Sequence, residues 1–83
     1  MVSLTEVETS NADTTAMVRL RIQIERTLKS SAFDALRDIV CENHGQVIVL
    51  RGHVESFFLK QQAQEAVRKI DRRVPIVNLV SVG

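Results

Sequence analysis

The sequence predicts an α+β fold, in the order α-β-β-α-β, with a three-stranded mixed sheet and two helices packed on one face. Two observations predict it. Apolar residues recur at helical spacing over 17–28 and 59–70, and short runs rich in β-branched residues lie at 39–41, 47–50 and 76–80. With 83 residues, of which 45% are hydrophobic, the chain can build one domain with a single two-layer core.

The first segment shows two periods. Apolar and polar residues alternate from 18 to 24, as in a strand, yet a second pattern recurs every three or four residues, at Met17, Leu20, Ile24 and Leu28. The helical pattern continues to Leu28, beyond the alternation, so it decides the prediction. We predict a helix over about residues 15–30, with Val18 and Ile22 beside its core stripe.

Residues 1–14 are rich in Ser, Thr, Asn and acidic residues and contain no Lys or Arg, which favours a flexible N-terminal tail. The domain then occupies residues 15–83. That body holds all eleven basic residues against seven acidic ones, a net charge of +4. This is less than the dense basic stripe of a nucleic-acid binder, so no nucleic-acid partner is expected, but a weak preference for an anionic surface is compatible with it.

Residues 36–43 predict the first strand, with Ile39 and Cys41 on one face and Val40 on the other. A turn follows, in which Gly45 can take a positive φ. The second strand, 47–54, places Ile48, Leu50 and Val54 on its core face and Val47 and Val49 on the opposite face. Gly52 inside this strand indicates a bulge or the close approach of a helix.

Ser56 is placed to cap a second helix over 57–70. Its apolar stripe is Leu59, Ala63, Ala66, Val67 and Ile70. The small side chains of Ala63 and Ala66 allow this helix to lie close to the sheet. Pro75 excludes helix beyond it, and residues 76–82 predict the closing strand.

These residues resemble the BON domain family, named for bacterial OsmY and nodulation proteins. The family pattern is V-x-L-x-G-x-V-x-S, an Ala-rich helix and a closing strand that begins near V-x-N. The matching residues here are Ile48, Leu50, Gly52, Val54 and Ser56, then LKQQAQEAV, then VPIVNLVSV with Asn78 as the family's Asn. The resemblance covers about residues 36–82 and extends loosely to the first helix; the chain departs from the pattern at Gln46 and Arg73.

The resemblance implies a non-catalytic binding module that associates with a phospholipid surface. Its alternative is a module for protein–protein interaction or homo-oligomerisation. It implies no enzyme activity, no cofactor and no small-molecule substrate. The chain also lacks the GxxxxGK[ST] pattern of a phosphate loop.

Cys41, His44 and His53 are the only soft metal ligands in the sequence. A structural zinc site needs four ligands, so we expect no metal site. A nucleophilic role for Cys41 would require an orienting third group and an oxyanion hole, and neither is evident. We therefore expect a buried thiol and two surface imidazoles.

Phe57 and Phe58 open the second helix, and Phe57 falls on the helix side opposite the apolar stripe. We expect it to be partly exposed, so that the pair docks into a bilayer interface or a partner pocket. The alternative is that the tail or the edge of the second strand covers this first turn and closes a small satellite core.

A basic cluster ends the second helix: Arg68, Lys69, Arg72 and Arg73. It is either favourable charge placement at a helix C-terminus or a contact for anionic lipid. The outer sheet face also carries apolar residues, Val40, Val47 and Val49, with Val77 and Leu79 as further members. This face, or an exposed strand edge, is a candidate surface for self-association or protein docking, unless Arg51 and other basic side chains cover it.

The start of the chain, MVSLTEVETSNADTT, has neither the positively charged region nor the apolar region of a secretory signal. No apolar run approaches the roughly 18 residues of a membrane span. We expect a cytoplasmic protein, or a periplasmic or envelope-associated one if a signal sequence has been removed.

Overall fold

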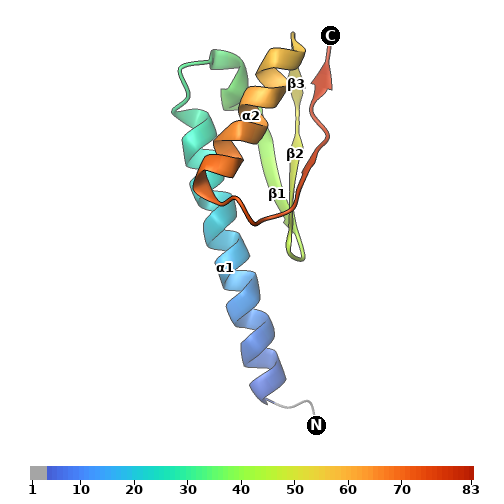
Figure 1. Ribbon diagram of the computed structural model, residues 1–83. Coiled ribbons are helices and arrows are strands. Elements are labelled where there is room, and N and C mark those ends of the chain that lie inside the picture. Colours follow the sequence, from blue (N-terminus) through green and yellow to red (C-terminus); the bar gives the residue numbers. More distant parts are fainter. Residues whose placement is uncertain (1–3) are drawn as a thin grey trace.

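The computed structural model describes residues 4–83, with side chains from residue 15 onward. A three-stranded sheet has the order β1-β2-β4, in which β1 and β2 are antiparallel and β2 and β4 are parallel. The two helices, α1 and α2, lie side by side on one face of this sheet, and the other face is open (Figure 1). This architecture confirms the predicted α+β fold.

Helix α1 runs from Leu4 to Lys29. Its helical prediction is confirmed, because Met17, Ile24 and Leu28 are buried in the core while Ile22 is 38% exposed. In the sequence, Asp13, Thr14 and Thr15 offer oxygens that can cap a helix, which favours a start near residue 15. Such residues also fit a helix interior at a small cost in helix propensity, and α1 begins before them. Of the predicted tail, residues 1–3 lie outside the described residues and the rest of its backbone belongs to α1, so the division at residue 14 stays a prediction.

The link from α1 to the sheet contains a 3₁₀ helix, η1, from Asp34 to Asp38. The predicted first strand therefore starts too early, since β1 spans Val40–His44. Leu36 explains the difference. Its side chain is buried in the core although the residue lies in η1. An apolar residue at this position therefore does not indicate a strand.

Strands β1 and β2 (Val47–Arg51) form a hairpin in which His44 opposes Val47 across a two-residue turn. Gly45 has a φ of 60°, and Gln46 has a negative φ. A positive φ at the first central position alone is typical of a type II′ turn, which favours Gly at that position. The turn function predicted for Gly45 is thus confirmed.

Gly52 separates β2 from the short strand β3 (His53–Val54). Its φ is 152°, and a Cβ added there would lie 3.3 Å from the Ile39 Cα and 3.4 Å from the Ile39 Cγ1. A close approach at Gly52 is therefore present, but it comes from Ile39, in the chain entering β1, and not from a helix as predicted.

Strands β4 (Ile76–Asn78) and β5 (Ser81–Val82) pair with β2 and β3 respectively. Backbone hydrogen bonds continue the parallel pairing across both interruptions, from Leu79 N to Leu50 O at 2.8 Å and from Ser81 N to Gly52 O at 2.9 Å. The two predicted strands, 47–54 and 76–82, thus behave as long strands that each contain one irregular step.

Helix α2 runs from Phe57 to Ile70, and the Ser56 Oγ accepts a hydrogen bond from the Leu59 N–H at 3.3 Å, as an N-cap does. Ala63 and Val67 are fully buried against the sheet, and Ala66 is half-buried. Asn78 ties the two layers together. Its Nδ2 donates to the Lys60 carbonyl at 3.0 Å, and its Oδ1 accepts from the Val80 N–H at 3.2 Å.

Candidate interaction surface

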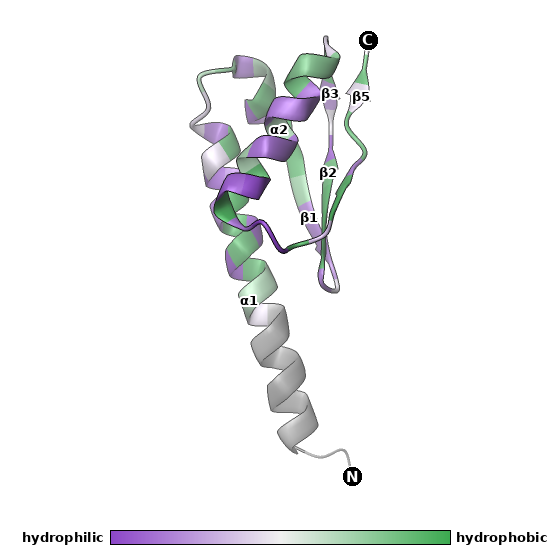
Figure 2. Ribbon diagram, viewed as in Figure 1, coloured by the Kyte–Doolittle hydropathy of each residue, from purple (hydrophilic) through white to green (hydrophobic). Residues whose placement is uncertain are grey.

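The first turn of α2 exposes two aromatic side chains. Phe57 is 61% exposed and Phe58 is 54% exposed. Figure 2 shows this hydrophobic first turn and the mostly hydrophilic turns that follow it. Neither phenylalanine belongs to the core cluster of the described residues. The predicted exposure of Phe57 is therefore met, and Phe58 shares it.

A third aromatic joins this pair. Phe33, in the link between α1 and η1, meets Phe58 edge to face, with ring centroids 5.7 Å apart and ring planes at 80°. This geometry is favourable for two aromatic rings. Phe33 is itself 39% exposed, so the contact covers only part of each ring. Sequence reasoning missed Phe33 because it lies outside every periodic stretch; an isolated aromatic in a polar link was its only signal.

The basic cluster lies at the other end of α2. Its members are all exposed: Arg68, Lys69, Arg72 and Arg73. Three of them line a shallow hollow of about 450 Å³ together with Glu65. No ion pair in the described part of the chain engages any of the four, so their charges face solvent.

The phenylalanines and the basic cluster share one side of α2. Phe57 and Arg68 are eleven residues apart, which corresponds to about three turns and an axial distance of about 16 Å. By helical spacing both lie on the side of α2 opposite Ala66 and Ile70, which pack against the core. The outer side of α2 is thus aromatic at its start and cationic at its end.

Helix α1 adds positive charge to the same layer. Arg19 and Arg26 are exposed and lie seven residues apart, on the stripe opposite Ile24. Because α1 and α2 cover the same face of the sheet, their outer sides point the same way (Figure 1). These two arginines extend the cationic surface beyond the residues that the sequence singled out.

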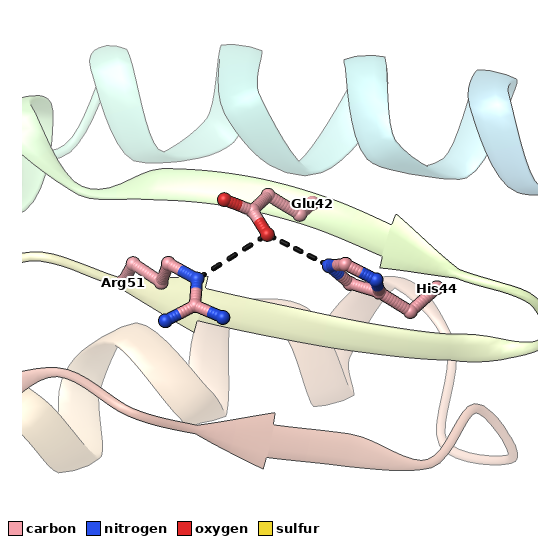
Figure 3. Close-up of polar contacts among 3 residues, drawn as sticks. All are labelled: Glu42, His44 and Arg51. Atoms are coloured by element: carbon pink, nitrogen blue, oxygen red, sulfur yellow. Dashed lines mark hydrogen bonds and ion pairs between the residues drawn. The ribbon is translucent and has the colours of Figure 1, made fainter.

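The open sheet face is partly closed by charged residues. The Glu42 Oε1 accepts from the His44 Nε2 at 2.7 Å and from the Arg51 Nε at 3.3 Å (Figure 3). These hydrogen bonds lower the pKa of Glu42, with that from His44 contributing most. Glu42 directly opposes Val49 in the hairpin register. This arrangement spreads a polar network over the middle of the face.

The valines named for this face differ in accessibility. Val40 is 52% exposed, Val47 is half-buried and Val49 is only 6% exposed, so Val49 offers almost no surface to a partner. Val49 lies in the central strand, between Glu42 of β1 and Val77 of β4. Val77, in β4, and Leu79, directly after β4, remain exposed.

Cys41 and the two histidines do not come together. Cys41 is buried under the helices, whereas His44 lies on the open face and His53 hydrogen-bonds Ser81 and Gly83 between β3 and β5. Across the described residues, no three side chains of His, Cys, Asp or Glu gather where they could hold a metal ion. Burial, with a smaller contribution from Glu25, raises the pKa of Cys41 to about 11, so the thiol is protonated and unreactive at neutral pH.

The raised pKa of Cys41 predicts a loss of stability at high pH. Between pH 9 and about 11 the unfolded chain releases the thiol proton while the folded chain keeps it, so the folded state is progressively disfavoured. The two-unit difference corresponds to about 2 to 3 kcal/mol. Urea titrations from pH 8 to 11 should show this decline in the parent and a clearly shallower one in Cys41→Ala. Equal slopes in the two proteins would contradict it.

Among the described residues, no helix is long and apolar enough to cross a bilayer. Comparison of the chain with family models, with curated proteins and with solved structures found no match. The surface must therefore be interpreted from its own geometry, and the resemblance to the BON family stays a prediction.

Proposed function

We propose that this chain is a non-catalytic binding module that associates with anionic phospholipid surfaces through the outer side of its helix layer. The observation that carries the proposal is the outer side of α2, which exposes Phe57 and Phe58 at one end and the basic cluster at the other. Aromatic rings insert at the level of the lipid headgroups, and Lys and Arg attract anionic headgroups.

The expected magnitudes make this binding weak and reversible. Burying a phenylalanine completely contributes about 1.5 to 3 kcal/mol, and these two side chains have roughly half their surface left to bury. Each Lys or Arg near an anionic membrane adds about 1 kcal/mol. Salt should weaken the second contribution, since the Debye length falls to about 8 Å at physiological ionic strength.

A binding role also fits the chemistry of the interior. Cys41 is the strongest nucleophile in the sequence, and its burial and raised pKa keep it as a thiol. The hollows found on the described surface are shallow and open, unlike the enclosed sites in which catalytic groups are desolvated. These features support a module that works by contact.

Docking through the middle of the open sheet face is less well supported. Val49 is buried, and the network of Glu42, His44 and Arg51 would have to be desolvated by any partner that covered it. The helix side imposes no such cost, because its cations can stay hydrated beside lipid headgroups.

The double substitution Phe57→Ser with Phe58→Ser tests the proposal. Binding to vesicles that contain anionic phospholipid should weaken about 10- to 30-fold, as each aromatic ring loses about 1 kcal/mol of interfacial contact. Co-sedimentation with vesicles of increasing anionic content measures this, with purely neutral vesicles as the reference composition.

Val77→Ser is the matched control, because it removes an exposed apolar side chain from the opposite side of the molecule. It should bind vesicles like the parent. If the parent binds neither vesicle, or if the double serine variant binds as well as the parent, the proposed function is wrong.

A further inference from the structure

Strand β1 presents an unpaired edge. It lies at one end of the order β1-β2-β4, so only its β2 side is hydrogen-bonded. The two-residue turn makes His44 and Val47 the hydrogen-bonded pair nearest the turn, and the pattern alternates along the hairpin. The N–H and C=O groups of Cys41 and Asn43 therefore point away from β2, toward the free edge.

The two edges of the sheet are built differently. The far edge, formed by β4 and β5, consists of short strands with an irregular step between them and with Pro75 just before β4. Short strands, prolines and irregularities are devices that discourage edge pairing. β1 has no such protection, because its five residues pair with β2 without a bulge and include neither Pro nor Lys.

A flank of α1 that carries both charged and apolar side chains borders this free edge. Arg21 and Glu25 line an open groove of about 490 Å³ together with residues 40–44 of β1. Val18, Ile22 and Glu25 recur at helical spacing, so the first two lie on the same flank. Val18 is half-buried and Ile22 is exposed. Neither belongs to the buried core cluster of the described residues, so both keep apolar surface that another chain can contact.

We infer that this edge binds a second copy of the same chain, with β1 pairing antiparallel to β1 around a two-fold axis at Asn43. The two sheets then become one six-stranded sheet. The same axis brings the two α1 helices together, antiparallel, through Val18 and Ile22. Main-chain hydrogen bonds supply the register and the helix flanks supply the apolar contact, so one isologous interface uses both unpartnered features.

Charge selects this register over its neighbour. With Asn43 opposite Asn43, Glu42 of each copy lies opposite His44 of the other, and the two Asn43 carboxamides can donate to and accept from each other. In the next register that still lets the outward N–H and C=O groups of Cys41 and Asn43 form hydrogen bonds, the two-fold axis passes through Glu42. The two Glu42 carboxylates would then lie directly opposite each other, which is destabilising. The sequence Glu-Asn-His, residues 42–44, is thus self-complementary when reversed.

The assembly has a geometric consequence for the helix layer. A two-fold axis that joins antiparallel edges is perpendicular to the sheet, so both helix layers face the same side. A dimer would present two copies of the outer side of α2 to one surface, and a second weak contact would then raise the overall affinity. The dimer itself does not depend on lipid, so it can be tested in solution without vesicles.

Sedimentation velocity of the chain over a wide concentration range tests the inference. The parent should form a dimer at high concentration. Ile22→Lys should raise the dissociation constant about tenfold or more, since it charges the helix contact without touching the hydrogen bonds of β1. Asn43→Pro should do the same, since it removes one outward N–H in an edge strand that can tolerate proline.

Val77→Lys, on the open sheet face, is the control and should dimerise like the parent. A parent that stays monomeric at every concentration overturns the inference. So does a dimer that Val77→Lys weakens and Ile22→Lys leaves intact, because that dimer would use the sheet face.

Disulfide cross-linking tests the proposed register of the two β1 strands directly. Asn43→Cys, made together with Cys41→Ala, should oxidise to a disulfide-linked dimer, since paired residues across antiparallel strands lie about 5.5 Å apart at Cα, within disulfide range. Ser81→Cys, at the opposite edge and in the same background, should stay monomeric. Equal cross-linking of the two variants would overturn the proposed register.

Discussion

Gly52→Ala is expected to lower the free energy of unfolding by about 2 to 4 kcal/mol. Two costs combine. An alanine at a φ of 152° is strained in any surroundings, and such positions cost about 1 to 3 kcal/mol. The new methyl would also meet the Ile39 Cα at 3.3 Å and the Asp38 carbonyl oxygen at 3.8 Å. Because the nearest atom belongs to the backbone, no side-chain rotation relieves the contact.

Gly45→Ala is the matched control. It also forces a positive φ, 60°, on an alanine, but nothing lies within 4 Å of the added Cβ. Its cost should be about 1 kcal/mol, the conformational penalty alone. Urea denaturation followed by circular dichroism measures both. A small domain has only about 5 to 15 kcal/mol of stability, so the Gly52 variant should lose a large part of it.

The difference between the two variants isolates the close approach of Ile39. If both lose the same stability, the junction between β2 and β3 relaxes without cost and Gly52 has no packing role. If Gly52→Ala alone is strongly destabilised, the glycine is required because Ile39, in the chain entering β1, lies too close to leave room for a Cβ.

Alternation along a strand made the core faces predictable. Ile48, Leu50 and Val54 share one face of 47–54, and all three are buried as expected. Val49 shows the limit of that reasoning. It lies on the outer face, yet it is buried because β2 is the central strand and has neighbours on both sides. Strand order is a property of the assembled sheet, and a period of two residues carries no information about it.

The boundaries were less predictable than the elements. Leu36 was included in the predicted first strand, 36–43, but its buried side chain belongs to a 3₁₀ helix. Its burial depends on the packing of α1 and α2 above it, which local propensity does not describe. The start of α1 at Leu4 likewise lay beyond prediction, since residues 13–15 can either cap a helix or continue one.

Only part of the candidate surface was predictable from the sequence. A helical wheel of 57–70 placed Phe57 outward because the buried stripe of α2 is regular. Phe33 could not be placed, because its contact with Phe58 joins two segments that only the fold brings together. Arg19 and Arg26 became relevant for the same reason, once both helices were found on one face of the sheet.

Neutralising the end of α2 should have the larger effect on lipid binding. With Arg68→Gln, Lys69→Gln and Arg72→Gln together, affinity for anionic vesicles should fall about 100-fold at low salt. The reason is that each cation contributes about 1 kcal/mol near an anionic surface. The side chains are exposed and free of ion pairs in the described part of the chain, so their removal should leave the fold intact.

The control must change the net charge by the same amount, because the negative surface potential of the vesicles attracts the positive charge of the whole molecule. Val40→Glu, Gln46→Glu and Leu79→Glu together also lower the net charge by three, but on the sheet side of the molecule, where these residues are exposed. If net charge alone governs binding, both triple variants weaken it alike and salt reduces both effects equally. If the helix layer makes the contact, the Gln variant loses far more affinity than the Glu variant. The salt dependence of its residual binding should also become shallower, because three of the side chains that respond to screening are gone and, of the cations named on this surface, only Arg73 and the two exposed arginines of α1 remain.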